Sequence, residues 1–200
     1  MAQATRNDAT ILAAAAKVFL DDPQAPISRV AQEAGVGISA LYHRYSSKEA
    51  LLRRLCLDGL ERYIAEAEAT LADDRDPWTA YSSFMQRIVD ADTHSIVLRL
   101  AGTFKPGKKL FERAAKAQEL NVEVFDRAKA AGVLRADIEV VDIALIFEQL
   151  AAIRIADPAR TRDLRQRYLT LIFDGLRAHQ AKPLPGPPPT WSEVNGRWDA

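Results

Sequence analysis

The sequence predicts an all-α protein of about nine helices, and three observations lead to this expectation. Hydrophobic residues recur at intervals of three and four along most of the chain, which is the pattern of one buried helix face. Glycine and proline interrupt these apolar stripes, so each stripe reads as a separate helix. No stretch alternates cleanly between apolar and polar residues as a half-buried strand does, although the short run 138–141 is ambiguous.

The composition is that of a globular chain without net charge: 200 residues with 27 Lys and Arg against 27 Asp and Glu. Because there is no basic excess, any binding to nucleic acid has to depend on where the cations sit. No run approaches the ~18 apolar residues of a membrane span, and the N-terminus has no apolar core of a secretory signal. We therefore expect a cytoplasmic protein without a membrane partner.

Cys56 is the single cysteine, which excludes an internal disulfide and suits a reducing compartment. With three scattered histidines it offers no metal-ligand spacing, so we expect no metal and no other cofactor. Its place among leucines favours a buried, inert thiol over a redox sensor. His94 stands near Asp92 and Ser95, which favours a helix boundary over a catalytic triad because adjacent helical residues point in different directions.

The first apolar stripe, which contains Ile11, Ala15 and Phe19, predicts a helix that ends before Pro23. Residues 25–52 then read as helix, tight turn and helix. The stretch after residue 47 is long enough for a helix that connects this segment to the rest of the chain. Further helical stripes follow over 84–97, 111–125, 143–153 and 164–176.

The helix–turn–helix segment has the residue types that its geometry needs. Pro26 suits the first helical turn, and Gly35 supplies the left-handed conformation that ends the helix. Val36 fills the gap between the two helices. Leu41 and Tyr45 lie four residues apart on one face, where they close a small core with the first helix.

The opposite face of the second helix is short and mixed. It offers donors, a hydroxyl group and an apolar tip, and a major groove accepts a helix of this kind. Just after it, Ser46 or Ser47 can cap the next helix, whose first N–H groups form an anion site together with Lys48. The alternative is that Lys48 is a solvated surface lysine. The outward residues are Gly37, Ile38, Ser39, Tyr42, His43 and Arg44.

Residues 35–45, Gly-Val-Gly-Ile-Ser-Ala-Leu-Tyr-His-Arg-Tyr, with Ser-Lys-Glu-Ala-Leu-Leu over 47–52, closely resemble the DNA-binding signature of the TetR/AcrR transcriptional regulators. Residues 127–137 resemble the junction between the last ligand-domain helices of that family. The resemblance implies a homodimer with two N-terminal DNA-reading heads. It also implies a C-terminal helical domain that forms the dimer and binds a small molecule, which usually releases the DNA.

The chain departs from the family pattern at the start of the second helix. Family members commonly place Thr or Ser where this chain has Ala25 and Pro26, so a phosphate contact is either missing or taken over by Ser28. Gly37 replaces the usual polar residue. Ile38 stands where a polar or basic residue is frequent, and it would touch a thymine methyl group instead.

On the family pattern, Tyr42 and Lys48 contact phosphate groups. Ser39, His43 and Arg44 discriminate among base pairs, with a backbone contact as the alternative for His43 or Arg44. Phosphate contacts position a protein on DNA, whereas base contacts select the sequence.

We expect three regions: a helix-turn-helix DNA-binding domain over 1–55, a helical ligand-binding and dimerisation domain over 56–181, and a Pro-rich tail over 182–200. The second region is large enough for a pocket between helices, and its apolar side chains favour a mainly apolar organic ligand. Polar residues on otherwise apolar faces would orient it. The pocket candidates are Trp78, Tyr81, Phe84, Met85, Arg99, Phe104, Phe111, Gln118, Phe125, Phe147 and Glu148.

Two late stripes, over 140–155 and 161–179, carry more apolar surface than a chain end needs for its own core. Two such helices from each subunit would form a symmetric four-helix interface. Small residues allow the helices to cross closely. The interface candidates are Ala144, Ala151, Leu164, Tyr168, Leu171 and Gly175.

The tail contains Pro-Leu-Pro-Gly-Pro-Pro-Pro-Thr over 183–190, which predicts an extended chain. A solvated tail is the favoured interpretation, and a docking motif for an aromatic-lined groove is the alternative. Trp191 and Trp198 either fold back onto the body or pack on a partner subunit. The basic run 105–109 favours a solvated loop over a second nucleic-acid contact.

Together these features predict a homodimeric, sequence-specific transcriptional regulator, a repressor that a small ligand releases from a palindromic operator. Its partners are double-stranded DNA, the effector and a second copy of the chain. One alternative is a helical protein-interaction module that does not bind DNA. The less favoured alternative is a helical enzyme, for which no convergent acid, base or metal set is visible in the sequence.

Overall fold

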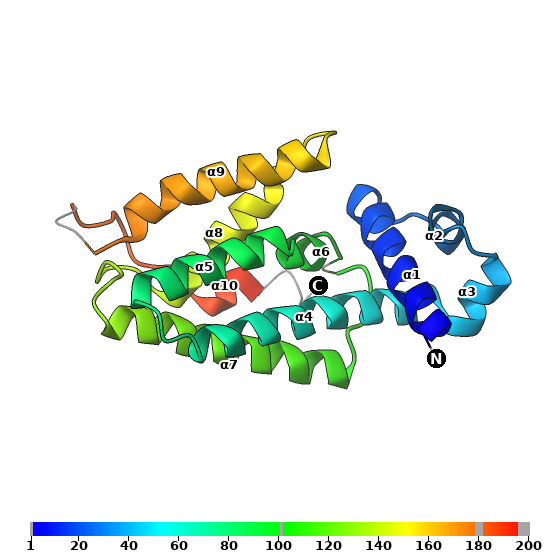
Figure 1. Ribbon diagram of the computed structural model, residues 1–200, viewed down its shortest axis with the longest axis horizontal. Helices are drawn as coiled ribbons and strands as arrows, with labels where there is room; N and C mark the ends of the chain where they lie inside the picture. The colour runs from blue at the N-terminus through cyan, green and yellow to red at the C-terminus, as the bar shows by residue number, and fades with distance from the viewer. Residues whose placement is uncertain (1, 101, 179–181, 196–200) are drawn as a thin grey trace.

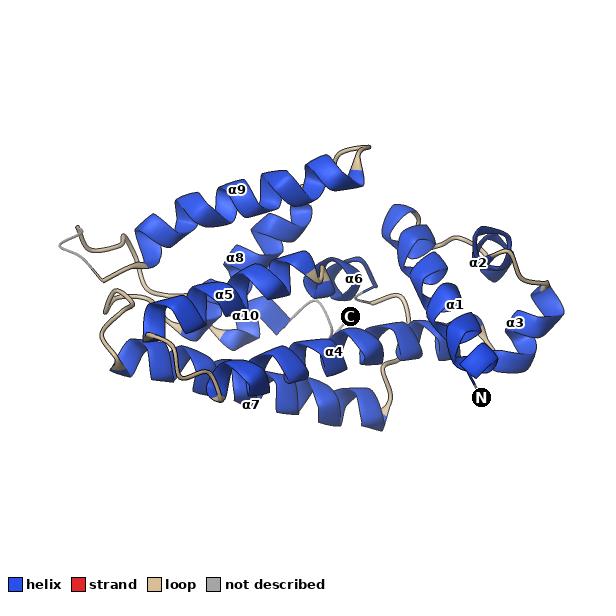
Figure 2. Ribbon diagram, viewed as in Figure 1, coloured by secondary structure: helices blue, strands red, loops and turns tan. Residues whose placement is uncertain are grey.

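The computed structural model describes residues 2–100, 102–178 and 182–195. Within those ranges it contains ten helices and no strand, which confirms the all-α class (Figure 2). None of the described helices is long and apolar enough to cross a membrane. The helices are α1 (Ala2–Asp21), α2 (Ile27–Ala34), α3 (Ile38–Arg44), α4 (Lys48–Leu71), α5 (Pro77–Asp90), α6 (Thr93–Leu100), α7 (Lys108–Ala130), α8 (Val140–Ala152), α9 (Pro158–Leu176) and α10 (Trp191–Asn195).

The molecule is elongated, with α1, α2 and α3 gathered at one end (Figure 1). Helix α4 starts at this end and runs along the body, where α7 packs against it. Helices α5, α6 and α8 lie between α4 and α9, and α9 forms the opposite edge. We call α1–α3 with the first half of α4 the head, and the remaining helices the body.

Two clusters of buried apolar side chains hold the helices together. The head cluster contains Phe19 and Leu41, both completely buried as predicted. Leu100, the last residue of α6, and Phe104, between α6 and α7, close this cluster from the body side. The body cluster joins α4, α5, α7, α8 and α9. Leu60 packs against both clusters, so helix α4 connects the head cluster to the body cluster.

Local sequence explains the helix ends around the head. Gly35 ends α2 with a left-handed backbone (φ 65°), and its N–H donates to two carbonyls of the last turn, as predicted. Ser47 caps α4, because its Oγ accepts the N–H of Ala50 at 3.1 Å. Pro26 lies at the N-cap of α2 rather than in the first turn, and no side chain caps this helix.

Candidate DNA-binding surface and ligand cavity

Helix α3 has one buried side and one outer side. Leu41 is completely buried and Tyr45 nearly so, which fixes the rotation of α3 against α1. On the outer side Ile38 is 40% exposed and Tyr42 is 49% exposed. The other sequence-predicted contacts on this end are also exposed, namely Ser28, Gly37, Ser39, His43 and Arg44.

The carboxylate of Asp8 in α1 ties α3 to its neighbours. Arg44 donates from Nε to Asp8 Oδ1 at 3.0 Å, and the hydroxyl group of Tyr45 donates to the same oxygen. Arg54 of α4 lies 4.0 Å from the other carboxylate oxygen. The hydrogen bond from Arg44 holds the pKa of Asp8 below its usual value, so the carboxylate stays charged at neutral pH.

Lys48 begins α4 and is half-buried. Its Nζ donates to the backbone carbonyl of Pro23 at 3.1 Å and lies 5.2 Å from the ring centroid of Phe19. Burial lowers the pKa of Lys48, and the charge of Asp22 opposes that shift. Lys48 therefore braces the α1–α2 connection against α4 instead of extending into solvent.

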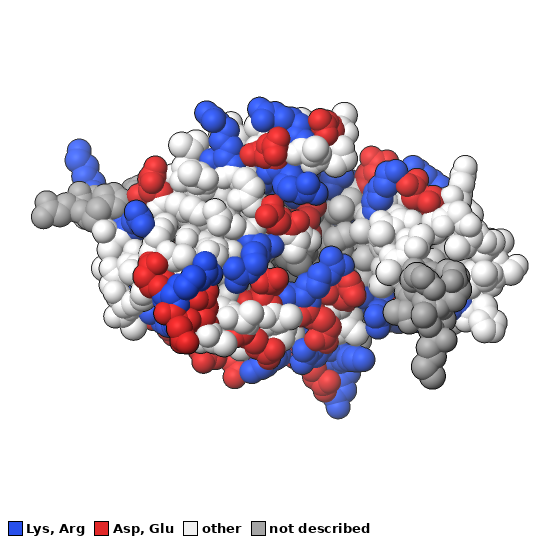
Figure 3. Space-filling model, in the orientation of Figure 1, with Lys and Arg blue, Asp and Glu red and all other residues white. Residues whose placement is uncertain are grey.

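The charged side chains of the head are unevenly placed on the face that Figure 3 shows. Charges of both signs are interspersed over the body, whereas the end formed by α2 and α3 is mostly uncharged in the view of Figure 3. Several head cations have carboxylate neighbours: Arg29 lies 3.8 Å from Asp21, and Arg53 lies 2.7 Å from Glu49. The outer side of α3 thus provides a surface complementary to a groove, with hydroxyl groups and apolar side chains, rather than a strong positive field.

A cavity of about 180 Å³ lies in the body between α4, α6, α7, α8 and α10. Three aromatic rings line it, those of Tyr63, His94 and Trp191, and among the residues that the structure describes none of the lining is Asp, Glu, Lys or Arg. A cavity with this lining favours an uncharged ligand, because a charge brought there from water would lack a partner. The lining residues are Gly59, Leu60, Tyr63, His94, Val97, Ala117, Gln118, Asn121, Ala144 and Trp191.

The polar groups of the cavity come from three helices. The Tyr63 hydroxyl group donates to Oδ1 of Asn121 at 2.7 Å. The ring of His94 lies 4.7 Å from that of Phe147, centroid to centroid, and 6.0 Å from that of Tyr63. Burial lowers the pKa of His94 to about 4, so its imidazole is neutral at pH 7.

Two protein-family models match this chain. The model described as bacterial regulatory proteins, tetR family, matches residues 11–55. The model described as transcriptional regulator SbtR-like, C-terminal domain, matches residues 76–178, which is more than half of the chain. The chain belongs to the TetR family of transcriptional regulators. Members of this family regulate transcription and are not enzymes, so the helical-enzyme alternative is set aside.

Solved structures of TetR regulators are similar along most of the chain. The regulator SCO0520 from Streptomyces coelicolor is 28% identical, with a TM-score of 0.60, and the match covers 87% of this chain and 99% of that one. A regulator from Mycobacterium vanbaalenii is 26% identical, with a TM-score of 0.60 and coverages of 88% and 98%. LfrR from Mycobacterium smegmatis, in complex with proflavine, is 21% identical, with a TM-score of 0.61 and coverages of 82% and 95%. No curated protein matches the chain.

In this TetR-family chain, the sequence-predicted pocket residues are scattered, and Gln118 is the one candidate among those lining the described cavity. Phe147 lies behind the cavity against His94, and Glu148 is half-buried on α8. Arg99 donates to the backbone carbonyls of Leu20 and Asp21 instead. The remaining candidates lie in the body cluster (Tyr81, Phe84, Met85, Phe125), against that cluster (Trp78), in the head cluster (Phe104) or at the surface (Phe111, 60% exposed).

Several cavity residues of the regulator were not among the sequence candidates. Gln118 and Asn121 lie three residues apart, which places two amides on one face of α7, and this spacing was a usable signal. Gly59 and Tyr63 lie four residues apart, so they too share one face of their helix, α4. His94 and Trp191 carry no such signal, because only the packing of α6 and α10 against other helices brings them to the cavity.

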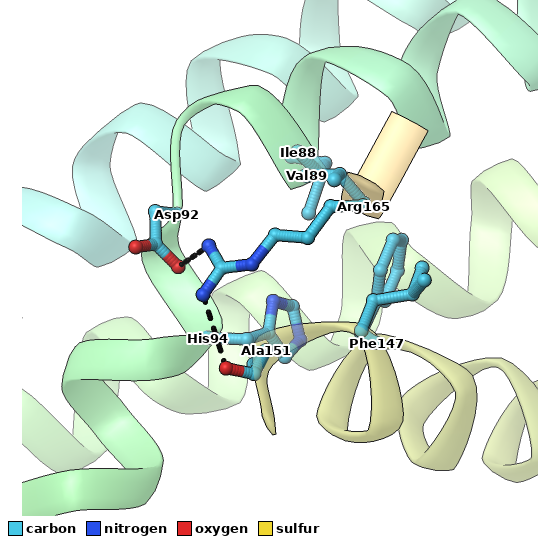
Figure 4. Close-up of a pocket in the computed structure, with 8 residues that line it drawn as sticks. Ile88, Val89, Asp92, His94, Phe147, Ala151 and Arg165 are labelled. Carbon is cyan, nitrogen blue, oxygen red and sulfur yellow. Dashed lines mark hydrogen bonds and ion pairs between the residues drawn. The ribbon is translucent and has the colours of Figure 1, made fainter. Parts of the chain in front are cut away.

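Asp92 and Ser95 bind an arginine in the regulator rather than forming a triad with His94, and Figure 4 shows the ion pair of this arginine with Asp92. Arg165 of α9 is 5% exposed, and its Nη1 lies 2.6 Å from Oδ1 of Asp92. Its Nη2 donates to Ser95 Oγ at 3.1 Å and to the carbonyl of Ala151 at 3.0 Å. Asp92 lies between α5 and α6 with a positive φ of 51°, which agrees with the predicted helix boundary.

The predicted dimer residues on α9 form one outward stripe. Tyr168 and Leu171 are 47% and 58% exposed, Gly175 is exposed and Leu164 is half-buried. Their spacings of four, three and four residues place them on one helix face. The predicted residues on α8 differ: Ala144 lines the cavity, and Ala151 is buried.

Proposed function

We propose that this TetR-family regulator is a homodimeric, sequence-specific repressor that a small, mainly apolar ligand releases from a palindromic operator in the cytoplasm. In this proposal residues 1–55 form the DNA-binding domain and residues 56–181 form the ligand-binding and dimerisation domain. The observation that carries the proposal is the position of α6, which contributes to the cavity and also contacts the head.

Helix α3 is the element proposed to enter the major groove. Its outer side combines Ile38, Ser39 and His43 on a helix whose rotation the buried Leu41 fixes. Tyr42 and Lys48 are assigned to phosphate groups. For the remaining predicted contacts, Arg44 is assigned to base edges, Ser28 to phosphate, and Gly37 with Ile38 to close apolar contact with a thymine methyl group.

The dimer is proposed to form through α8 and α9. The stripe of Leu164, Tyr168, Leu171 and Gly175 supports this assignment, because apolar side chains that line up on the outer face of one helix form a patch, and such patches mark interaction sites. A two-fold axis across this face would place two copies of α3 at a fixed spacing. Such a dimer fits a palindromic operator with half-sites in successive major grooves.

The ligand is proposed to bind in the cavity of about 180 Å³ and to act through α6. His94 and Val97 of α6 line this cavity, and two residues later Arg99 donates to the carbonyls of Leu20 and Asp21 at 3.1 and 3.0 Å, at the end of α1. A shift of α6 would therefore move the head directly. A ligand that favours the shifted state lowers the population that matches the operator spacing.

The contact between head and body leaves room for such a movement. A cleft of about 560 Å³ separates α1 and α2 from the α8–α9 connection, and its lining is largely charged, including Lys17, Glu33 and Arg154. On this side, charged and solvated walls resist relative motion less than the packed apolar contact that Leu100 and Phe104 make with the head.

DNA selection with the full-length protein tests the proposal, followed by anisotropy titration of the selected duplex. Palindromic sites and more than tenfold weaker binding by Tyr42→Ala are expected. A panel of uncharged aromatic compounds should then contain members that lower operator affinity, and Arg99→Met should reduce that response while retaining operator binding. Failure to select any sequence would support the interaction-module alternative, and ligands that bind without changing operator affinity would refute release.

A further inference from the structure

The chain after the proline-rich run returns to the body and contributes to the cavity. Helix α10, the short red helix of Figure 1, lies against α8. Its first residue, Trp191, lines the cavity together with residues of α4, α6, α7 and α8. Val194, one turn later, is buried. Residues 182–188 are exposed, and the segment packs on the body at Trp191 and Val194, whereas Trp198 lies outside the described residues.

Side-chain hydrogen bonds hold the start of this segment on the body, and the packing of Trp191 and Val194 holds its end. Arg135 donates from Nη2 to the carbonyl of Lys182 at 2.9 Å. The N–H of Leu184 donates to Oδ2 of Asp137, also at 2.9 Å. At the far end, the N–H of Thr190 donates to Oε2 of Glu193 at 2.7 Å, which caps α10.

The residues between these anchors are mostly proline. Five of the seven residues over 183–189 are Pro, and their fixed φ leaves little conformational freedom to lose when the segment is ordered. A short, stiff connection of this kind places α10 reproducibly. Preorganised walls of a binding site bind more tightly, because less ordering accompanies binding.

We propose that residues 182–195 form a C-terminal strap that completes the effector cavity, and that the indole ring of Trp191 stacks on an uncharged aromatic effector. This inference rests on the proposed function, since it assigns the ligand class of the same cavity. Trp191, Tyr63 and His94 supply three aromatic rings to a cavity whose described lining carries no charged side chain, which suits a planar, neutral molecule. The amide of Gln118 offers one polar contact to orient it.

The proposed specificity can be measured with a matched pair of fluorescent probes. N-Phenyl-1-naphthylamine is neutral, and 8-anilino-1-naphthalenesulfonate has the same ring system with a sulfonate group. The full-length protein is expected to bind the neutral probe at least tenfold more tightly. Equal or tighter binding of the sulfonate would overturn the assignment to uncharged ligands.

Variants of the strap test the role of Trp191. Trp191→Ala should weaken binding of N-phenyl-1-naphthylamine by about tenfold, and Trp191→Phe by less, because a ring remains. Leu184→Ala is the matched control on the same strap, since Leu184 is 45% exposed, and it should bind like the parent. The midpoint of thermal unfolding of each variant should equal that of the parent, because Trp191 belongs to neither core cluster.

A chain in which Trp191 is the sole tryptophan, made by Trp78→Phe and Trp198→Phe, gives a direct readout. Its emission should be quenched as the neutral probe binds, because the probe accepts energy from tryptophan. Parent-like probe affinity in Trp191→Ala, absence of probe binding, or unquenched emission would each overturn the strap proposal. Operator binding is measured without probe in parallel, so loss of that activity in the parent would contradict the proposed function alone.

Discussion

Arg44 at the end of helix α3 donates from Nε to Asp8 Oδ1 in helix α1, 36 residues earlier, at 3.0 Å. The same oxygen accepts the hydroxyl group of the buried Tyr45. A single carboxylate thus sets the end of α3 against α1. The proposed DNA-reading surface is therefore positioned by a residue that does not belong to the helix–turn–helix segment.

Replacing Asp8 should loosen the head. Asp8→Ala leaves the buried Tyr45 hydroxyl group without its acceptor, and we expect the free energy of unfolding to fall by about 1–2 kcal/mol. Urea denaturation measures this change. In a Tyr45→Phe background the same substitution should cost clearly less, and equal costs in the two backgrounds would show that the Tyr45–Asp8 bond does not hold α3.

Lys48 should contribute to DNA affinity through its charge and to stability through the aliphatic part of its side chain. Lys48→Met retains apolar contact with Phe19 but removes the charge, and we expect the slope of log K against log salt to decrease in magnitude by about 0.9 per lost phosphate contact. Lys48→Ala should show the same slope and lower stability. An unchanged slope in both variants would mean that Lys48 only braces Pro23.

Leu171→Glu should convert the proposed dimer to monomer. Placing a carboxylate on the proposed α9 interface would leave a charge without a partner on association. Sedimentation velocity reports the oligomeric state. Phe111→Glu is the matched control, because Phe111 on α7 is 60% exposed and Leu171 is 58% exposed. Dimerisation that survives Leu171→Glu, or dissociation in both variants, contradicts the assigned interface.

His94 should make stability depend on pH. Its pKa is lowered from the usual 6.5 to about 4 by burial, so between these values the unfolded state binds a proton that the folded state does not. This contribution to stability is present above pH 6.5 and is lost as the pH falls toward 4. We expect the free energy of unfolding to drop by about 1–2 kcal/mol between pH 7 and 5.

Variants at two histidines separate this effect from general acid sensitivity. His94→Gln should flatten the profile between pH 7 and 5, as measured by urea denaturation at each pH. His43→Gln is the control, since His43 is exposed on α3, and it should follow the parent. A parent-like slope in His94→Gln would show that another group titrates in this range.

The sequence predicted the head in detail because its determinants are local. Gly35 ends α2 through its own backbone conformation, and Ser47 caps α4 through an N–H three residues away. Leu41 and Tyr45 are buried because they lie four residues apart on one helix face. Such relationships span a few residues, so spacing and residue type suffice to predict them.

The cavity could not be predicted in the same way. Aromatic residues such as Phe84 and Phe125 were candidates by type, yet they fill the core, whereas His94, Asn121 and Trp191 line the cavity. Whether an apolar side chain packs or lines a space depends on how five helices meet. The spacing of Gln118 and Asn121 shows that two amides share one face of α7, but it does not show that this face lines a cavity.

By itself the sequence determined the helical class, the helix–turn–helix segment, its exposed face and the apolar stripe of α9. Only the tertiary structure decided that Asp8 holds Arg44, that Lys48 binds the Pro23 carbonyl, and that the tail returns Trp191 to the cavity. The physical reason is distance along the chain. Helix periodicity and caps arise among neighbours, but these contacts join residues whose approach depends on the packing of whole helices.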